Sequence, residues 1–464
     1  MAVSSVLLAT FLSLAPQGPE GSAAQPILAP AEQKSLRDKA LKLIETRTAY
    51  DLAPEKARDK ANRDYQKAKE AFQKEWEGRI EKKGNLLKSL PDLQAIFANS
   101  FTYERRSGTD MIKKEDAKPK DGLPEYSVMV PKAYKNDVPM RSLLVVPGRV
   151  SEKDGWVEGR DHYAQTWDGS ASSKDSIFHV AQIDKTIALD DLPVAGREGE
   201  EEKEVARIGS LLLGFGETKR NFNLDRGRVF LDCGKESSAF GLRLATHFPD
   251  LFAGVILRWP VFQEDLRLGS IAGLPVLLVA TAETKDAAAK LKDSLDKLQA
   301  GSCTVMDATG AYPFRDGTAE IEKWMADKQR RLMRPQIVVE PNDDRFKKAF
   351  WAVIGRMDPL AALPRDMRPR LEVSADRATN RITVKSRGVE NFALWLNDSL
   401  VDLDKEYTVV VNDKAFTQKS TRDFGRMFDQ MLVKFDGDFL FPVLFECNVP
   451  AETKAPATGG EGKQ

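Results

Sequence analysis

A short turn between an apolar run and a helical segment carries the side chains of this 464-residue chain that are best placed for chemistry. The turn reads Cys233-Gly-Lys-Glu-Ser237 and follows the mostly apolar run Arg228-Val-Phe-Leu231. A thiol, an amine and a hydroxyl therefore lie within five positions, and each type can act as a nucleophile or base in a suitable environment. Ser237 or Ser238 could attack a carbonyl, with Lys235 as a desolvated, neutral base. Cys233 could instead serve as a thiol nucleophile.

Histidine, the usual base for such a nucleophile near neutral pH, is scarce in this chain. It occurs three times, as His162, His179 and His247. No group of His, Asp and Glu has the spacing of metal ligands, so we expect neither a metal site nor a cofactor. The three cysteines are too few and too scattered for a disulfide framework or a zinc site.

Charge and length limit the classes of function. Lys and Arg together number 70, as do Asp and Glu, and the formal net charge is zero. A neutral chain is a poor candidate for binding nucleic acid, which needs a surplus of cations. The length predicts about three domains, and the 42% hydrophobic content is typical of globular proteins. With nucleic acid excluded, we expect the partner to be a ligand or a protein, which the sequence does not identify.

Residues 1–24 have the pattern of a signal peptide. Residues 3–15 are mostly apolar, and Ser22-Ala-Ala24 supplies small side chains at a cleavage site, although no Lys or Arg precedes the apolar run. The run is shorter than the about 20 residues that span a bilayer, and no later stretch predicts a transmembrane segment. We expect an exported protein, periplasmic or secreted. The alternatives are a disordered N-terminus or a misplaced start codon.

The next region, 31–100, predicts a helical hairpin. Apolar residues recur three or four positions apart from Ala57 to Ile80, and Pro54 separates this helix from an earlier one. Gly84 follows two lysines at the expected end of the second helix. Such a stripe usually packs within its own protein, but it could also bind a partner.

Two further domains follow, according to the change in periodicity. In 122–332, apolar runs of strand length alternate with helical segments, which predicts a doubly wound α/β sheet covered on both faces. Its last helix should extend from Ala319 to about Leu332. In 335–450, short β-like runs predict a small antiparallel, β-sandwich-like domain with one helix near 424–433. Residues 451–464 predict a disordered tail.

Three segments of the α/β region resemble α/β-hydrolases of the prolyl-oligopeptidase-like and secreted-esterase kind. Leu123-Pro-Glu-Tyr-Ser-Val-Met-Val-Pro-Lys132 is similar to an early strand of these enzymes, and Asp225-Arg-Gly-Arg-Val-Phe-Leu231 to the strand before their nucleophile. Leu242-Arg-Leu-Ala-Thr-His-Phe-Pro-Asp-Leu-Phe-Ala-Gly-Val255 is similar to the helix and strand that follow it. The resemblance implies that residues 233–237 form the Gly-x-Ser-x-Gly nucleophile elbow.

At the elbow the resemblance places Lys235 where the family has its serine. It implies that the triad acid is Glu283 or Asp286, and that Tyr312 is at or beside the position of the triad histidine. The His-Gly-Gly oxyanion loop of the family corresponds to Gly148 and Arg149, of which only Gly148 matches.

Two hypotheses follow from these departures. In the first, the chain is a pseudo-hydrolase that has lost its triad and acts by binding. In the second, it is an active esterase or peptidase with a shifted site made of Ser237 and Lys235.

Overall fold

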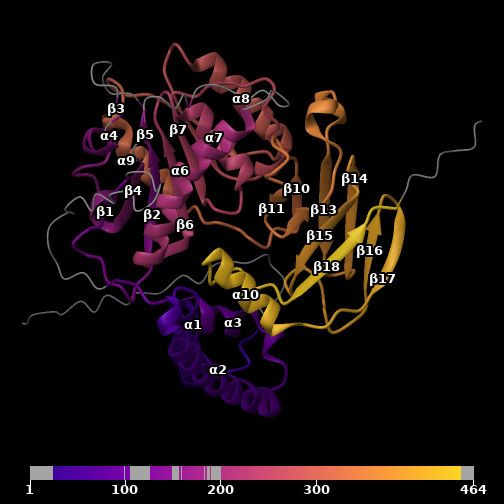
Figure 1. Cartoon of the computed structure of the whole chain (residues 1–464). Helices are drawn as coiled ribbons and strands as arrows, with labels where there is room; N and C mark the ends of the chain where they lie inside the picture. Colours follow the sequence, from indigo (N-terminus) through magenta and orange to yellow (C-terminus); the bar gives the residue numbers. More distant parts are fainter. Residues whose placement is uncertain are drawn as a thin grey trace, which may run out of the picture.

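The computed structural model describes residues 25–98, 100–104, 126–148, 156–157, 159–181, 183–184, 189 and 200–450 (Figure 1). The predicted signal peptide, the C-terminal tail and Arg149 lie outside these ranges. Within them, a seven-stranded sheet has the order β1-β4-β2-β6-β7-β8-β9. Its strands are β1 (Tyr126–Met129), β2 (Met140–Val146), β4 (Ser176–Ala181), β6 (Leu224–Cys233), β7 (Gly254–Arg258), β8 (Val276–Ala280) and β9 (Cys303–Asp307). β1 runs antiparallel to β4, and the remaining neighbours are parallel.

Helices cover both faces of this sheet, so the predicted doubly wound arrangement is confirmed. They are α4 (Gly159–Thr166), α5 (Ser172–Asp175), α6 (Glu200–Asn221), α7 (Ser238–His247), α8 (Lys285–Leu298) and α9 (Thr318–Met325). Alternate residues of each strand enter two different core clusters, one with α6, α7 and α8 and the other with α4 and α9. The helix predicted to reach Leu332 ends at Met325, because the backbone turns at residues 326–327. A separate two-stranded sheet pairs β3 (Trp156–Val157) with β5 (Ile183–Asp184).

The helical hairpin is present and consists of α1 (Pro30–Asp51) and α2 (Glu55–Lys83). Pro54 is the N-cap of α2, and Gly84 ends that helix with a φ of 88°. A short 3-10 helix, η1 (Leu86–Lys88), leads into α3 (Leu90–Phe97). Of the predicted stripe of α2, only Ala68, Phe72 and Trp76 are buried. The first turns of α2 therefore extend beyond the packed part of the hairpin.

The C-terminal β region contains two sheets around one hydrophobic core, as a sandwich requires. One has the order β10-β13-β14-β16-β17, with β10 (Gln336–Val339), β13 (Arg370–Asp376), β14 (Arg381–Arg387), β16 (Tyr407–Val411) and β17 (Lys414–Gln418). The other has the order β11-β12-β15-β18, with β11 (Lys348–Ala349), β12 (Ala352–Ile354), β15 (Asn391–Leu396) and β18 (Val443–Asn448). All described pairs are antiparallel except β14 with β16. The predicted tight turn at Asn412-Asp413 has φ of 45° and 66°.

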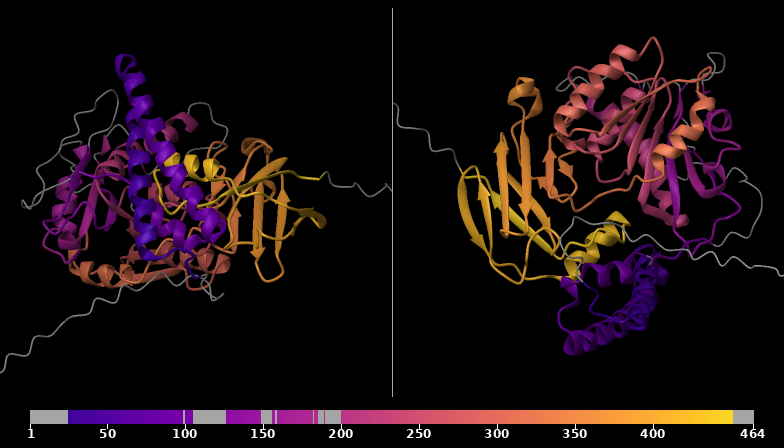
Figure 2. Two further views of the ribbon diagram at one scale, coloured as in Figure 1. Left: turned by 90° about the horizontal axis from the view of Figure 1, so that it is seen from below. Right: turned by 180° about the vertical axis from the view of Figure 1, so that it is seen from behind.

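The helix α10 (Phe424–Lys434) leaves this sandwich and packs against α1, α2 and α3 (Figures 1 and 2). Ion pairs also connect the end of α10 and the residues just after it to the α/β region. Arg330 binds Asp436 at 2.5 Å and Asp438 at 3.1 Å, and Asp250 pairs with Lys434 at 3.2 Å. The remaining 3-10 turns are η2 (Gly269–Ile271), η3 (Arg315–Gly317), η4 (Leu360–Ala362) and η5 (Arg365–Met367).

Candidate functional site

The turn between β6 and α7 lies at the carboxyl end of a central strand, which is where open parallel sheets bind ligands. Two glycines allow the chain segments to approach closely there. A Cβ atom on Gly234 would overlap the backbone of Gly148 and would lie 2.6 Å from the hydroxyl of Tyr312. A Cβ atom on Gly148 would in turn overlap that hydroxyl and lie 2.5 Å from the backbone nitrogen of Lys235. Gly148, Lys235 and Tyr312 are thus brought together.

Lys235 is the central residue of the turn 233–237, and its side chain is exposed. Its Nζ lies 4.0 Å from the centre of the Trp259 ring, a cation–π contact. In α/β-hydrolases the elbow is a strained turn. In this chain none of residues 233–238 has a positive φ, so the turn is relaxed. The ammonium group is therefore held against an aromatic face rather than lifted by a strained backbone.

Backbone strain occurs instead at two aromatic residues beside the turn. Trp259, just after β7, has a φ of 84°, and Phe314 has a φ of 67°. Their rings are parallel, with centroids 6.4 Å apart. Left-handed backbone at bulky residues costs free energy and is often found at functional sites. This aromatic pair therefore belongs to the candidate site, although its residue types carried no catalytic signal in the sequence.

Tyr312 is hydrogen-bonded directly to the backbone of the turn. Its hydroxyl accepts a hydrogen bond from the Lys235 backbone N–H at 2.8 Å, and its ring packs edge-on against Phe314. Burial raises the pKa of Tyr312 above its usual value. The side chain is therefore a neutral phenol over the physiological range, and it occupies the space beside Gly148.

The other candidate nucleophiles are buried, and the two serines among them donate hydrogen bonds to backbone carbonyls. Ser237 Oγ donates to the Val146 carbonyl at 2.7 Å, and Ser238 Oγ donates to the Arg258 carbonyl at 3.0 Å. Cys233 is fully buried, and burial raises the pKa of its thiol well above the usual value. These three side chains therefore have structural roles in packing the start of α7.

Glu283, one of the two predicted triad acids, lies apart from this group of contacts. It is exposed in the turn after β8, and in the described part of the chain it makes no hydrogen bond or ion pair. Asp286, in the first turn of α8, is also exposed. Neither carboxylate contacts Tyr312 among the described interactions.

A buried ion pair below the site was not identified from the sequence. Asp232, next to the turn, accepts from Arg258 Nε at 2.9 Å, and both side chains are fully buried. The Trp167 indole donates to the same carboxylate at 2.7 Å, and Arg258 also donates to the Pro313 carbonyl at 3.0 Å. The pair therefore connects the end of β6 to the loop that carries Tyr312. The only signal in the sequence was one charge in each of two apolar runs.

His162 lies beside the site, although its position in the sequence had argued against a role there. It precedes the expected position of the triad base by 150 residues, yet its ring centroid lies 6.5 Å from that of Tyr312. Both ring nitrogens are buried and have no hydrogen-bond partner among the residues that the structure describes, and burial lowers the pKa of His162 to about 4. His162 is thus a neutral, enclosed imidazole beside the phenol.

Neither a metal cluster nor a membrane helix is found in the ranges that the structure covers. No group of three or more His, Cys, Asp or Glu side chains there could hold a metal ion. None of the helices in those ranges combines the length and the apolar character that crossing a membrane requires.

Three solved structures each resemble less than half of this chain. A thermostable esterase matches 44% of this chain and 59% of its own, with 14% identity and a TM-score of 0.34. S-formylglutathione hydrolase (FrmB) from Staphylococcus aureus matches 48% and 99%, with 14% identity and a TM-score of 0.37. A CE1 ferulic acid esterase from Anaeromyces mucronatus matches 48% and 98%, with 8% identity and a TM-score of 0.30. No protein-family model and no curated protein matches the sequence.

Likeness at this level says nothing about activity, whereas the topology of the chain itself identifies its fold. The strand order, with one antiparallel edge strand and helices on both faces, and the strand–turn–helix at β6 and α7, define an α/β-hydrolase fold. One fold hosts many functions, and the residues of the site determine which chemistry a chain can perform.

Proposed function

We propose that this chain is a pseudo-hydrolase, which keeps the α/β-hydrolase fold but has lost the triad and acts by binding a ligand or partner. The observation that carries the proposal is the 2.8 Å hydrogen bond from the Lys235 N–H to the Tyr312 hydroxyl. It puts a neutral phenol where the resemblance implies an imidazole base. A separate contact supports it: the Lys235 ammonium group lies over the Trp259 ring, at the residue for which the resemblance implies a nucleophilic hydroxyl.

The contacts of the alternative site support the same proposal. A Ser/Lys hydrolase needs a serine hydroxyl free to attack and an amine that can take its proton. Ser237 Oγ is buried and donates to a backbone carbonyl, whereas the Lys235 amine is exposed over Trp259. No described contact joins these two groups.

Labelling with a fluorophosphonate probe and an ester panel tests the proposal. The purified full chain should show no labelled serine and no turnover of nitrophenyl esters or peptide anilides between pH 7 and 10. A known serine esterase in the same assay verifies the reagents, and circular dichroism verifies the fold. Labelling or turnover that disappears in Ser237→Ala, or turnover that disappears in Lys235→Met, would show an active hydrolase and overturn the proposal.

Export of the protein is a further part of this proposal, and residues 1–24 alone support it. Expression with its own N-terminus should place the mature chain outside the cytoplasm. N-terminal sequencing should then find a start near residue 25. An intact Met1 on cytoplasmic protein would contradict export and would leave the proposed binding function unaffected.

A further inference from the structure

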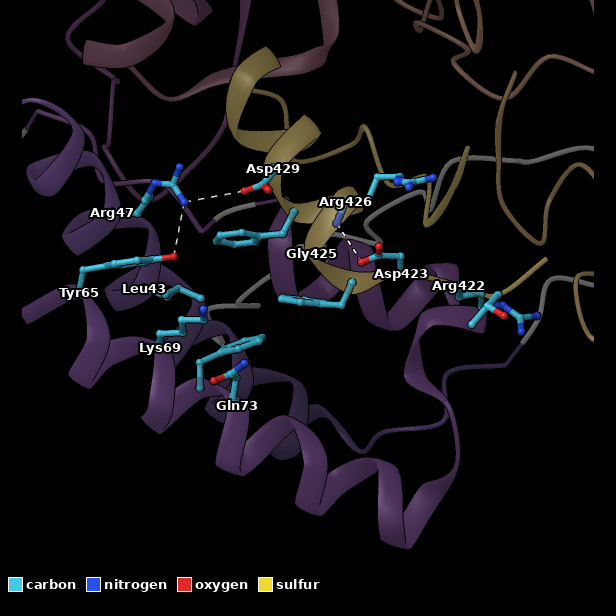
Figure 3. A pocket seen from close by; sticks show the side chains of 14 residues that line it. Leu43, Arg47, Tyr65, Lys69, Gln73, Arg422, Asp423, Gly425, Arg426 and Asp429 are labelled. Atoms are coloured by element: carbon cyan, nitrogen blue, oxygen red, sulfur yellow. Dashed lines mark hydrogen bonds and ion pairs between the residues drawn. The ribbon is translucent and has the colours of Figure 1, made fainter. Parts of the chain in front are cut away.

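A pocket of about 700 Å³ lies between the helical hairpin and α10 (Figure 3). Its apolar lining consists of Leu43 from α1, Phe72 from α2, and Phe424 and Phe428 from α10. The volume is in the range of sites that bind small molecules or anchor side chains. None of the residues that line the pocket belongs to the candidate hydrolase site, and nothing in the proposed function uses it.

The aromatic lining is held rigidly by its neighbours. The Phe424 ring lies 5.4 Å from Phe72, 5.0 Å from Trp76 and 5.5 Å from Phe428, measured between centroids. Phe424 nevertheless stays only half-buried. A half-covered aromatic ring in a fixed position can receive an apolar side chain with little ordering cost.

The polar lining has a surplus of positive charge. Asp423 already caps α10 by accepting the Arg426 N–H at 3.1 Å, and Asp429 lies 3.8 Å from Arg47. The side chains of Lys69 and Arg426, which also line the pocket, have no ion pair or hydrogen bond among the described residues. In a chain with zero net charge, two unpaired cations at an apolar pocket favour an anionic occupant.

An aromatic row extends the site along the hairpin, beyond the pocket itself. Tyr65 lines the pocket and stacks on Tyr50, with centroids 6.0 Å apart. Arg47 lies 5.5 Å from the Tyr65 ring, and Arg58 lies 5.5 Å from the Tyr50 ring. These half-exposed rings and cations continue the surface of the pocket toward the first turns of α2, where residues 55–60 are exposed. An occupant that uses all of it has to be elongated.

We propose that this surface docks an acidic, amphipathic peptide segment of a partner protein. An apolar side chain of the segment enters over the half-buried Phe424, and the carboxylates of the segment pair with Lys69 and Arg426. Neighbouring parts of the segment lie along Tyr65 and Tyr50. This is the helix-in-groove mode of peptide recognition with added charge complementarity.

Panning a random 12-residue peptide-display library against the folded full-length chain tests the proposal. The double variant Lys69→Glu/Arg426→Glu reverses the two free charges at exposed or half-exposed positions. The matched control, Lys67→Glu/Lys74→Glu, makes the same change in net charge on exposed lysines of α2 that do not line the pocket. Circular dichroism and thermal melting of both variants exclude unfolding as the cause of lost binding.

We expect the enriched peptides to combine an aromatic or aliphatic anchor with two or more acidic residues. Their affinity should fall about tenfold or more in the pocket variant, fall at high salt, and change less than threefold in the control. Three results would each overturn the proposal: no enrichment, enriched peptides without acidic residues, or equal binding to both variants. Saturable binding of dodecanoate in the pocket without any selected peptide would show a small-amphiphile site instead.

Discussion

The three histidines of this chain should make its stability fall steeply in mild acid. His162, His179 and His247 are 0%, 1% and 4% exposed, and burial lowers their pKa values to about 4, about 3 and about 4. An unfolded histidine titrates near pH 6.5. As the pH falls below 6.5, the unfolded chain therefore binds protons that the folded chain excludes. The stability is fully present above pH 6.5 and is lost progressively toward pH 4.

The size of the effect follows from these pKa differences. At pH 5 each imidazole should cost about 2 kcal/mol of unfolding free energy, or about 6 kcal/mol for the three. Domains are commonly stable by about 5–15 kcal/mol, so this is a large share. His162 gives the cleanest test, because in the described part of the chain neither of its ring nitrogens has a hydrogen-bond partner to lose. His162→Phe keeps a buried ring and removes one titrating group.

Urea unfolding at pH 7.5 and pH 5, followed by circular dichroism, measures the difference. The wild type should lose about 6 kcal/mol between these conditions and His162→Phe about 4 kcal/mol. Titration of the imidazole NMR signals in the folded protein is an independent check, since none should move between pH 8 and pH 5. An equal loss in both proteins, or an imidazole that titrates near 6.5 while the chain is folded, would refute the reasoning.

Further substitutions test the site and the connections between regions. Asp232→Asn or Arg258→Met should each cost about 3–5 kcal/mol in urea unfolding, whereas Asp232→Leu/Arg258→Met should recover most of that loss; additive costs would contradict the buried pair. Lys235→Ser should show at most trace esterase activity, and adding Tyr312→His should raise it by about 10²-fold; a single variant as active as the double would mean that the base lies elsewhere. Arg330→Gln leaves Asp436 buried without its partner, so limited proteolysis between the α/β and β regions should be faster than in wild type; unchanged cleavage would show that this pair does not hold the regions together.

The fold was predictable because burial leaves a regular pattern in the sequence. Strands such as β7 and β8 are buried on both faces, and their sequences are nearly continuous apolar runs. The limits of the hairpin helices were predictable for a different reason: Pro54 and Gly84 interrupt a helix through the local conformation of their backbone. The parallel pairing of β14 with β16 was not predicted, since an apolar alternation does not specify strand direction.

The site was only partly predictable, because its contacts join distant parts of the chain. The approach of Gly148, Lys235 and Tyr312 followed from the resemblance to a known fold. The position of His162 did not, because sequence order alone says nothing of which helix lies under which loop. The Asp232–Arg258 pair was also missed, since one charge in an apolar run does not name its partner. The pocket at Phe424 combines residues from both ends of the chain and has no local signature.

The packing of α10 on the hairpin has a consequence for the order of folding during synthesis. The hairpin leaves the ribosome first, but Met427, Phe428 and Met431, which complete its core, follow roughly 330 residues later. At about 5–20 residues per second this delay is about 15–65 s. During that time the apolar face around Phe72 and Phe97 has no permanent cover. Nascent hairpins of this chain should therefore depend on a chaperone, or on the slow arrival of their own C-terminus, far more than the α/β sheet does.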